Sequence, residues 1–156
     1  MQFEIKINSS IVLGCWNEED TTLSMAIESV FINLEKFTMK WHEHLLQISY
    51  NQDIADSIYD IISMLNSIKK KKQYHKIHFP SQHFFEVWEC YTEEEMTTIK
   101  WLNDDDLTDV FMESQLFINE WIKLLEQIYN CLFAVGYNKK NLEDFHLLEN
   151  ISNLRK

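Results

Sequence analysis

The sequence predicts a mainly α-helical fold: a helix-rich single domain with long antiparallel helices and a small N-terminal β-hairpin. Its 156 residues match the usual length of one domain and suffice to bury a core. Only two glycines and one proline occur, whereas β-sandwiches and β-barrels need many glycine- and proline-rich turns. A hydrophobic content of 46% with 13% aromatic residues is typical of a globular protein and argues against intrinsic disorder.

Alternating apolar residues predict the β-hairpin within residues 1–16. Phe3, Ile5 and Ile7 alternate with polar residues, which is the period of two that indicates a strand. Residues 8–10 can turn the chain, so residues 11–16 are expected to return as the second strand. Because a lone two-stranded hairpin is marginally stable in water, it requires packed helices or a third strand.

Residues 20–72 predict an antiparallel helical hairpin. Polar and acidic residues directly before its first apolar residue resemble a capped helix start. Apolar residues then recur every three or four positions, as one face of a long helix requires; they are Leu23, Ile27, Val30, Leu34, Phe37, Trp41, Leu45 and Ile48. A second helix is expected from Asn51 or Asp53 to the four lysines at residues 69–72. The short link between the two helices implies that they run antiparallel.

The segment 73–92 has the least regular pattern. Pro80 divides it, and the residue before a proline avoids helical backbone angles. We expect a short helix over residues 81–91, although their apolar residues also fit the alternation of a strand.

Further helices are predicted over residues 92–151. Thr92-Glu93-Glu94-Glu95 matches a capping box and is expected to start a helix that ends near residue 102. The acidic residues 104–106 are expected to open a long helix, for which Gly136 is well placed as the C-terminal cap. Asn141 is expected to cap the last helix.

Nearly all of the net charge of −11 is concentrated between residues 86 and 120. This window contains eleven acidic side chains and one basic side chain, Lys100. A large field of one sign destabilises a compact fold by self-repulsion, so it indicates a partner more than a fold. With a pI near 4.9, the protein is not expected to bind nucleic acid directly, because phosphate binding requires clustered Lys and Arg.

The candidate partner-binding surface combines the carboxylates of this window with aromatic residues among them. Trp and Tyr are the usual anchors of protein–protein interfaces, and complementary charge would speed encounter with a basic protein. The alternative is a solvated helical face with ordinary acidic residues at helix starts. The expected binding residues are Trp88, Tyr91, Glu93, Glu94, Glu95, Trp101, Asp104, Asp105, Asp106, Asp109 and Glu113.

Histidines give a weak indication of a metal site. His42 and His44 would point in different directions from the predicted helix, and their segment lacks the H-E-x-x-H spacing of zinc proteases. His75, His78 and His83 are better spaced, but no carboxylate lies nearer to them in sequence than Glu86. No metal or other cofactor is therefore predicted, and solvated or partly buried imidazoles are the default.

The sequence shows no catalytic signature, and the protein is predicted not to be an enzyme. Neither a glycine-rich phosphate loop nor a G-x-S-x-G motif occurs. Cys90 lies near His83 in sequence, but no third orienting group accompanies the pair. The acids around residues 104–109 lack the central glycine and the alternating positions of a calcium loop. An enzyme that uses one of the histidines with a carboxylate is the less favoured alternative.

The sequence predicts a cytoplasmic protein. No run of about 18 apolar residues could span a membrane, and the N-terminus lacks the basic and apolar regions of a signal peptide. The three cysteines, Cys15, Cys90 and Cys131, lie far apart among apolar neighbours. We therefore expect them to be reduced thiols in the core of the protein.

In its size, acidity, few cysteines and the acids mixed with Trp88, Tyr91 and Trp101, the chain resembles the immunity proteins of bacterial polymorphic toxins and contact-dependent growth inhibition. The resemblance covers the whole chain in overall style and includes no diagnostic motif, so it assigns no residue a role by position. It implies a protein that binds a cognate toxin domain, often a basic nuclease, and blocks its active site or substrate surface. The carboxylates of residues 93–113 would then stand in for nucleic-acid phosphates.

The second hypothesis is a small helical adaptor or regulatory subunit that acts through protein–protein interaction. It would be favoured by a large exposed apolar stripe on the predicted helix from Leu107 to Leu132 and by self-association through that stripe. The oligomeric state is open, with a monomer favoured.

Overall fold

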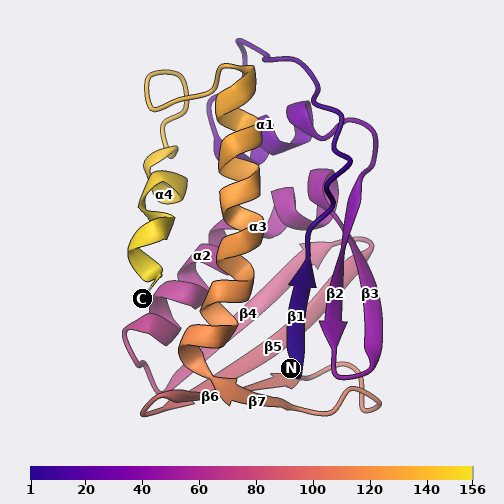
Figure 1. Cartoon of the computed structure of the whole chain (residues 1–156), viewed down its shortest axis with the longest axis vertical. Coiled ribbons are helices and arrows are strands. Elements are labelled where there is room, and N and C mark those ends of the chain that lie inside the picture. Colours follow the sequence, from indigo (N-terminus) through magenta and orange to yellow (C-terminus); the bar gives the residue numbers. More distant parts are fainter. Residues whose placement is uncertain (156) are drawn as a thin grey trace.

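The protein is a mixed α/β fold in which two antiparallel sheets, of three and four strands, pack with helices. The computed structural model describes residues 1–155. The prediction of a mainly helical, helix-rich fold is therefore wrong. The four-stranded sheet curves around the lower ends of the two longest helices (Figure 1).

The smaller sheet has the strand order β1-β2-β3. Its strands are β1 (Phe3–Lys6), β2 (Lys36–Trp41) and β3 (His44–Ser49). β1 lies where the sequence predicts a strand, but it pairs with β2, so that Phe3 lies opposite Trp41. Residues 11–16 form no strand, so the predicted N-terminal hairpin is wrong. Pairing with β2 places β1 in a sheet whose inner face is buried, which a hairpin of residues 1–16 would have lacked.

The larger sheet has the strand order β4-β5-β6-β7, with every neighbouring pair antiparallel. Its strands are β4 (Tyr74–Ser81), β5 (Phe84–Glu93), β6 (Met96–Trp101) and β7 (Val110–Glu113). Each strand follows the previous one along the chain. Loops of two residues join the first three strands, and a longer loop over residues 102–109 joins β6 to β7.

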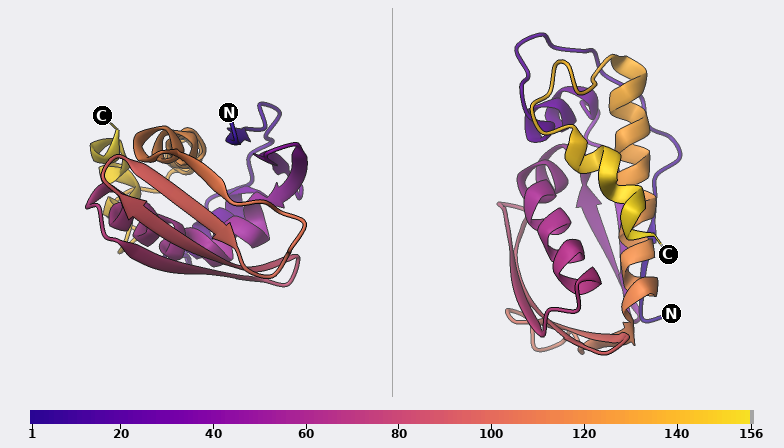
Figure 2. Two further views of the ribbon diagram at one scale, coloured as in Figure 1. Left: turned by 90° about the horizontal axis from the view of Figure 1, so that it is seen from below. Right: turned by 90° about the vertical axis from the view of Figure 1, so that its left-hand side faces the viewer.

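Two of the helices, α2 and α3, cover one face of this sheet. The helices of the chain are α1 (Leu23–Val30), a π-helical turn η1 (Tyr50–Ile54), α2 (Ala55–Lys69), α3 (Ser114–Val135), α4 (His146–Glu149) and a 3-10 turn η2 (Asn150–Leu154). Figure 2 shows α2 and α3 inside the curve of the sheet, whose other face has no helix or strand over it. We call this uncovered side of the four-stranded sheet the outer face.

Aromatic rings from both sheets and from α3 meet in the centre of the core. The ring centroids of Phe3 in β1 and Trp121 in α3 are 5.9 Å apart, and those of Trp41 in β2 and Trp88 in β5 are 5.1 Å apart. All four side chains are at most 1% exposed. Because each such ring buries roughly 150–250 Å², these contacts join the two sheets and the helix into one core.

The predicted long helix over residues 23–48 is wrong beyond Val30, where α1 ends. Leu34 and His42 adopt left-handed backbone angles, with φ of 58° and 55°, and each stands before a strand that the apolar pattern had assigned to the helix. In β2 the buried side chains are Phe37, Met39 and Trp41. Their period of two fits a strand with one buried face, whereas the helical interpretation used only the first and last of them.

The helices predicted over residues 81–91, from Thr92 and from 104–106 are also wrong. Residues 84–93 are β5, and residues 96–101 are β6. Glu94, inside the proposed capping box, has a φ of 54° and forms the turn between these strands. Residues 104–109 are a loop that leads into β7, so α3 begins only at Ser114.

The helix expected to end at residues 69–72 is confirmed as α2, and Gly136 is confirmed as the left-handed C-cap of α3, with a φ of 115°. The final helix is short: α4 starts at His146, five residues after the expected cap Asn141. The Asn141 side chain instead accepts a hydrogen bond from the backbone N–H of Asn138 at 2.8 Å.

Candidate partner-binding surface

The outer face of the four-stranded sheet carries the exposed aromatic and charged side chains of the predicted binding window. Alternate residues of each strand are buried against the helices, and those between them face solvent, as strand geometry requires. The solvent-facing residues are Tyr74, Lys76, His78 and Pro80 of β4, Phe85, Val87, Glu89, Tyr91 and Glu93 of β5, Met96, Thr98 and Lys100 of β6, and Phe111 and Glu113 of β7.

One row across the sheet is aromatic at three of its four positions. Tyr74, Tyr91, Thr98 and Phe111 lie opposite one another on successive strands. The exposed fractions of the three rings are 46%, 39% and 54% in that order. The rings of Tyr74 and Tyr91 contact each other with centroids 5.2 Å apart. Exposed aromatic residues held on a sheet lose little conformational entropy when a partner covers them.

A carboxylate fixes the two tyrosines of this row. Glu89 accepts hydrogen bonds from the hydroxyl of Tyr74 at 2.5 Å and from that of Tyr91 at 3.2 Å. The bond from Tyr74 is the main cause that lowers the pKa of Glu89, and the same bond raises the pKa of Tyr74 to about 12. Lys76 and Lys100 lie beside Glu89 in register, and the Nζ of Lys100 is 5.7 Å from the ring centroid of Tyr91. The centre of the outer face therefore carries two lysines against one glutamate and is not acidic.

The predicted acidic residues form two groups at opposite ends of the outer face. The hairpin acids are Glu93, Glu94, Glu95 and Glu113, at the turn between β5 and β6 and at the end of β7. The loop acids are Asp104, Asp105, Asp106 and Asp109, in the loop between β6 and β7. The six residues of β6 separate the groups by about 20 Å at roughly 3.3 Å per residue.

The predicted helical face that would gather Asp105, Asp109 and Glu113 does not exist, because the first two belong to the loop and the third to β7. Among the described residues, Glu95 is the one hairpin acid in an ion pair, and its partner is Lys71. Glu93, Glu94 and Glu113 have no basic partner within residues 1–155. Three of the four hairpin acids are therefore without a compensating ion pair among these residues.

Two of the three aromatic residues predicted to bind a partner belong to the core. Trp88 is completely buried and Trp101 is 7% exposed, with ring centroids 5.5 Å apart. The indole N–H of Trp101 donates to Glu86 at 2.7 Å. Tyr91 alone of the three is on the outer face. Tyr74, which sequence reasoning missed, joins it there because strand pairing brings the two into one row. Phe111 lies in the same row; it is an aromatic residue of the acidic window that was not among the expected binding residues.

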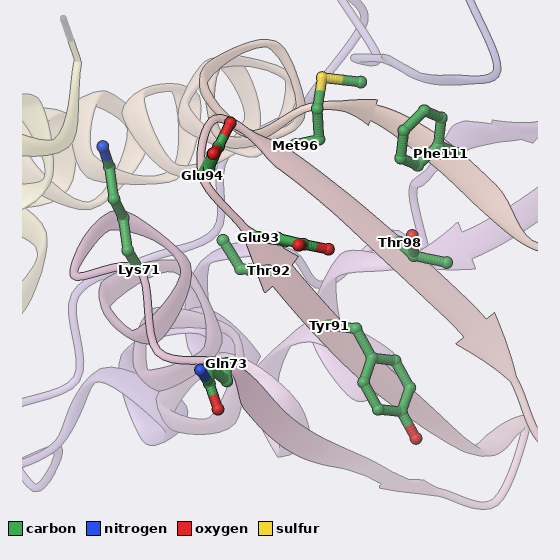
Figure 3. Close-up of a pocket in the computed structure, with 9 residues that line it drawn as sticks. All are labelled: Lys71, Gln73, Tyr91, Thr92, Glu93, Glu94, Met96, Thr98 and Phe111. Atoms are coloured by element: carbon green, nitrogen blue, oxygen red, sulfur yellow. The ribbon is translucent and has the colours of Figure 1, made fainter.

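A hollow of about 650 Å³ lies at the hairpin end of the outer face. Figure 3 shows Tyr91 and Phe111 on opposite sides of Thr98, with the carboxylate of Glu93 extending towards Thr98 from a third side. Lys71, Gln73, Thr92, Glu94 and Met96 complete the lining. The hollow thus combines ring surfaces with an unpaired carboxylate.

Comparison with protein-family models, with curated proteins and with solved structures found no match to this chain. Within residues 1–155, no helix combines the length and apolar character needed to cross a membrane. The function of the chain is therefore inferred from its own residues.

The groups considered for catalysis or metal binding do not converge. In the part of the chain that the structure describes, no three His, Cys, Asp or Glu side chains are placed to share a metal ion. Burial raises the pKa of the Cys90 thiol to about 12, which removes the thiolate that a nucleophilic cysteine needs.

The ring of His75 is hydrogen-bonded to the hydroxyl of Ser67 at 2.9 Å. Burial is the main cause that lowers the pKa of His75, and nearby Lys72 adds to it.

A second exposed surface, which sequence reasoning missed, surrounds Trp16. Trp16 is 47% exposed, whereas the other four tryptophans of the chain are buried. Its loop is fixed in place: the backbone N–H of Gly14 donates to the carbonyl of Val30 at 2.7 Å, and that of Asn17 donates to the Tyr137 hydroxyl at 3.0 Å. Ile32, which is also exposed, lines a shallow hollow together with Trp16. The sequence offers one indication of this surface: Trp16 follows Gly14, one of only two glycines in the chain, by two residues.

Proposed function

We propose that this protein is an immunity-type inhibitor that binds and neutralises a basic, nuclease-type toxin domain. The outer face of the four-stranded sheet supplies the contact surface. The single observation that supports the proposal most is the row of Tyr74, Tyr91 and Phe111, exposed on a rigid sheet between two groups of acids. Aromatic anchors inside a charged rim are the usual anatomy of a high-affinity interface.

The two parts of the surface have different roles in the proposed complex. The hairpin acids and loop acids attract a basic partner over about 8–10 Å at physiological ionic strength, and so accelerate encounter. The aromatic row is then covered by the partner and slows dissociation. Since the acids occupy both ends of the strands on the outer face, we infer that the toxin's basic substrate surface lies along the strands and is blocked along its length.

Association kinetics with a basic, nuclease-type toxin domain, sought in the reading frame next to the one that encodes this protein, would test the proposal. Reversing Asp104, Asp105, Asp109 and Glu113 to Lys is expected to lower the association rate constant about tenfold or more at low salt, because it reverses the steering field. Tyr91→Ala is expected to raise mainly the dissociation rate constant, since the contact forms after encounter. Stopped-flow fluorescence measures both rates.

The matched control carries the same number of charge reversals away from the sheet, at Glu18, Glu19, Glu28 and Glu143. All four of these residues are exposed, and the change in net charge is identical. If both quadruple variants slow association equally, net charge rather than the outer face governs encounter. Toxin that remains fully active with a stoichiometric excess of the wild-type protein would disprove the inhibitor proposal.

The adaptor hypothesis retains one supporting observation, the surface around Trp16. The apolar stripe it required on the helix from Leu107 to Leu132 is buried: the apolar residues of α3 from Phe117 to Leu132 that face the core are at most 1% exposed. An adaptor would therefore act through Trp16 and its exposed neighbours. Trp16→Ala would abolish partner binding on that hypothesis and leave the toxin affinity unchanged on the first.

A further inference from the structure

We propose that the hollow beside Thr98 binds the side chain of an arginine presented by the partner protein. The inference rests on the proposed function for the identity of the partner, but the binding chemistry belongs to the hollow itself. Three features carry it: two ring walls with a small residue between them, an unpaired carboxylate at one end, and one ring face that already accepts a cation.

The ring walls have the spacing that a planar cation requires. Tyr91, Thr98 and Phe111 lie opposite one another on β5, β6 and β7, so the two ring-bearing strands are about 10 Å apart across Thr98 at roughly 4.8 Å per strand. Thr98 is only partly exposed and leaves the space between the rings open. A guanidinium group placed there lies within about 6 Å of a ring centroid, the range of cation–π attraction.

Glu93 supplies the counter-charge. Its carboxylate extends over the hollow towards Thr98 (Figure 3). Within residues 1–155 it has no ion pair, and none of the side-chain hydrogen bonds involves it. Glu94 and Glu113 lie at the same end and are likewise without a basic partner among these residues. An incoming cation therefore displaces no existing ion pair of these carboxylates.

The position of Lys100 indicates which side of the Tyr91 ring is open to an incoming cation. Its Nζ lies 5.7 Å from the ring centroid of Tyr91, and the residue is in register with Glu89. Glu93 stands two residues from Tyr91 in the opposite direction along β5. The Tyr91 ring thus already contacts a cation on the Glu89 side, while the Glu93 side is open. Arginine fits this side better than lysine, because its planar fork pairs with a carboxylate through two bonds, stacks on rings and is less strongly hydrated.

Nuclear magnetic resonance titration of the full-length, isotope-labelled protein with the peptide acetyl-Gly-Arg-Gly-amide tests the inference. Saturable shifts are expected at the amides of Tyr91, Thr98 and Phe111. The matched peptide with citrulline, which is isosteric but uncharged, is expected to cause none. The lysine peptide is expected to bind about threefold to tenfold more weakly, since it forms a point contact rather than a fork.

Two pairs of variants separate this site from general charge attraction. Glu93→Gln is expected to weaken the arginine peptide about fivefold or more, whereas Asp105→Asn, which removes the same charge from the loop acids, is expected to leave its affinity within about twofold. Thr98→Phe fills the hollow and is expected to abolish the shifts. Val87→Phe adds the same ring elsewhere on the outer face and should not. Circular dichroism and the thermal midpoint establish that each variant is folded.

The inference is overturned if the arginine peptide causes no saturable shifts at these three residues, or if Asp105→Asn weakens it as much as Glu93→Gln does. Its failure is distinguishable from that of the proposed function. Tight toxin binding that Glu93→Gln and Thr98→Phe leave unchanged would support the inhibitor and reject the arginine site. If the arginine peptide binds the hollow but the wild-type protein has no effect on the toxin, the arginine site is supported and the inhibitor proposal is rejected.

Discussion

Burial decides what each of the three cysteine thiols can do. All three were expected in the core, but Cys15 is exposed in the loop beside Trp16, Cys90 is buried under the larger sheet, and Cys131 is intermediate. Burial raises the pKa of Cys90 to about 12 and also raises that of Cys131. A thiol reacts as its thiolate, so both position and ionisation disfavour reaction at Cys90.

Alkylation with iodoacetamide at pH 8 should therefore distinguish the thiols. Cys15 is expected to react within minutes, and Cys90 is expected to react at least about a hundredfold more slowly, because a pKa near 12 leaves little thiolate and its thiol is out of solvent. Peptide mass spectrometry at timed intervals measures the three rates. In urea, where burial is lost, all three rates should converge. A native Cys90 that reacts as fast as Cys15 would contradict the placement of β5.

At the scale of the elements, turns formed without glycine explain why several strands were not predicted from the sequence. Leu34, His42, Lys71 and Glu94 all have positive φ between 54° and 58°, a conformation that glycine or asparagine usually supplies. A chain with two glycines and one proline was therefore assumed to have few turns. The hairpins at His42 and Glu94 show that the inference from glycine content to helix was unsafe here.

Glu94→Gly is expected to stabilise the protein by about 0.5–1 kcal/mol, because glycine adopts the positive φ of this turn without steric strain. Equilibrium unfolding in urea measures the change. Glu94→Gln removes the same charge but keeps the strained backbone, so it separates relief of repulsion from relief of strain. An equal gain from both variants would assign the effect to charge and not to the turn.

At the scale of the whole molecule, the charge excess is concentrated on one layer. The four-stranded sheet and its loops carry ten of the eleven acidic residues of the window, all but Glu120 in α3. The solvent-facing residues of the smaller sheet include Lys6, Lys36 and Lys40. Repulsion among the acids opposes folding, whereas their field assists encounter with a basic partner. Salt should therefore act on stability and on association in opposite directions.

Raising sodium chloride from about 50 mM to about 500 mM is expected to increase the free energy of unfolding by roughly 1 kcal/mol, because screening weakens the repulsion. Over the same range, association with the toxin domain should slow at least about tenfold. The variant with Asp104, Asp105 and Asp106 changed to Asn should gain less stability from salt than the wild type. A loss of stability with salt in both proteins would show that attractive ion pairs dominate instead.

The sequence by itself determined the features that depend on local spacing. Apolar residues three and four apart, followed by lysines, identified α2, and Gly136 marked the end of α3, since both signals act within a few residues along the chain. The concentration of acids and the presence of Tyr91 among them could likewise be predicted from the sequence. The rest of the candidate site was not, because two predicted anchors, Trp88 and Trp101, have sequence neighbours like those of a surface residue yet point into the core.

Only the tertiary structure decided the arrangement of the surface. Steps of three and four residues fit Phe37, Trp41 and Ile48 to a helix, but pairing with β1 and β3 made Phe37 and Trp41 the inner face of a strand. Strand pairing also brought Tyr74, Tyr91 and Phe111 into one row and placed the two groups of acids at opposite ends of the strands, on either side of that row. The physical reason is that register between distant segments depends on burying one face of each strand against the same core, and that information is not contained in any short stretch of the chain.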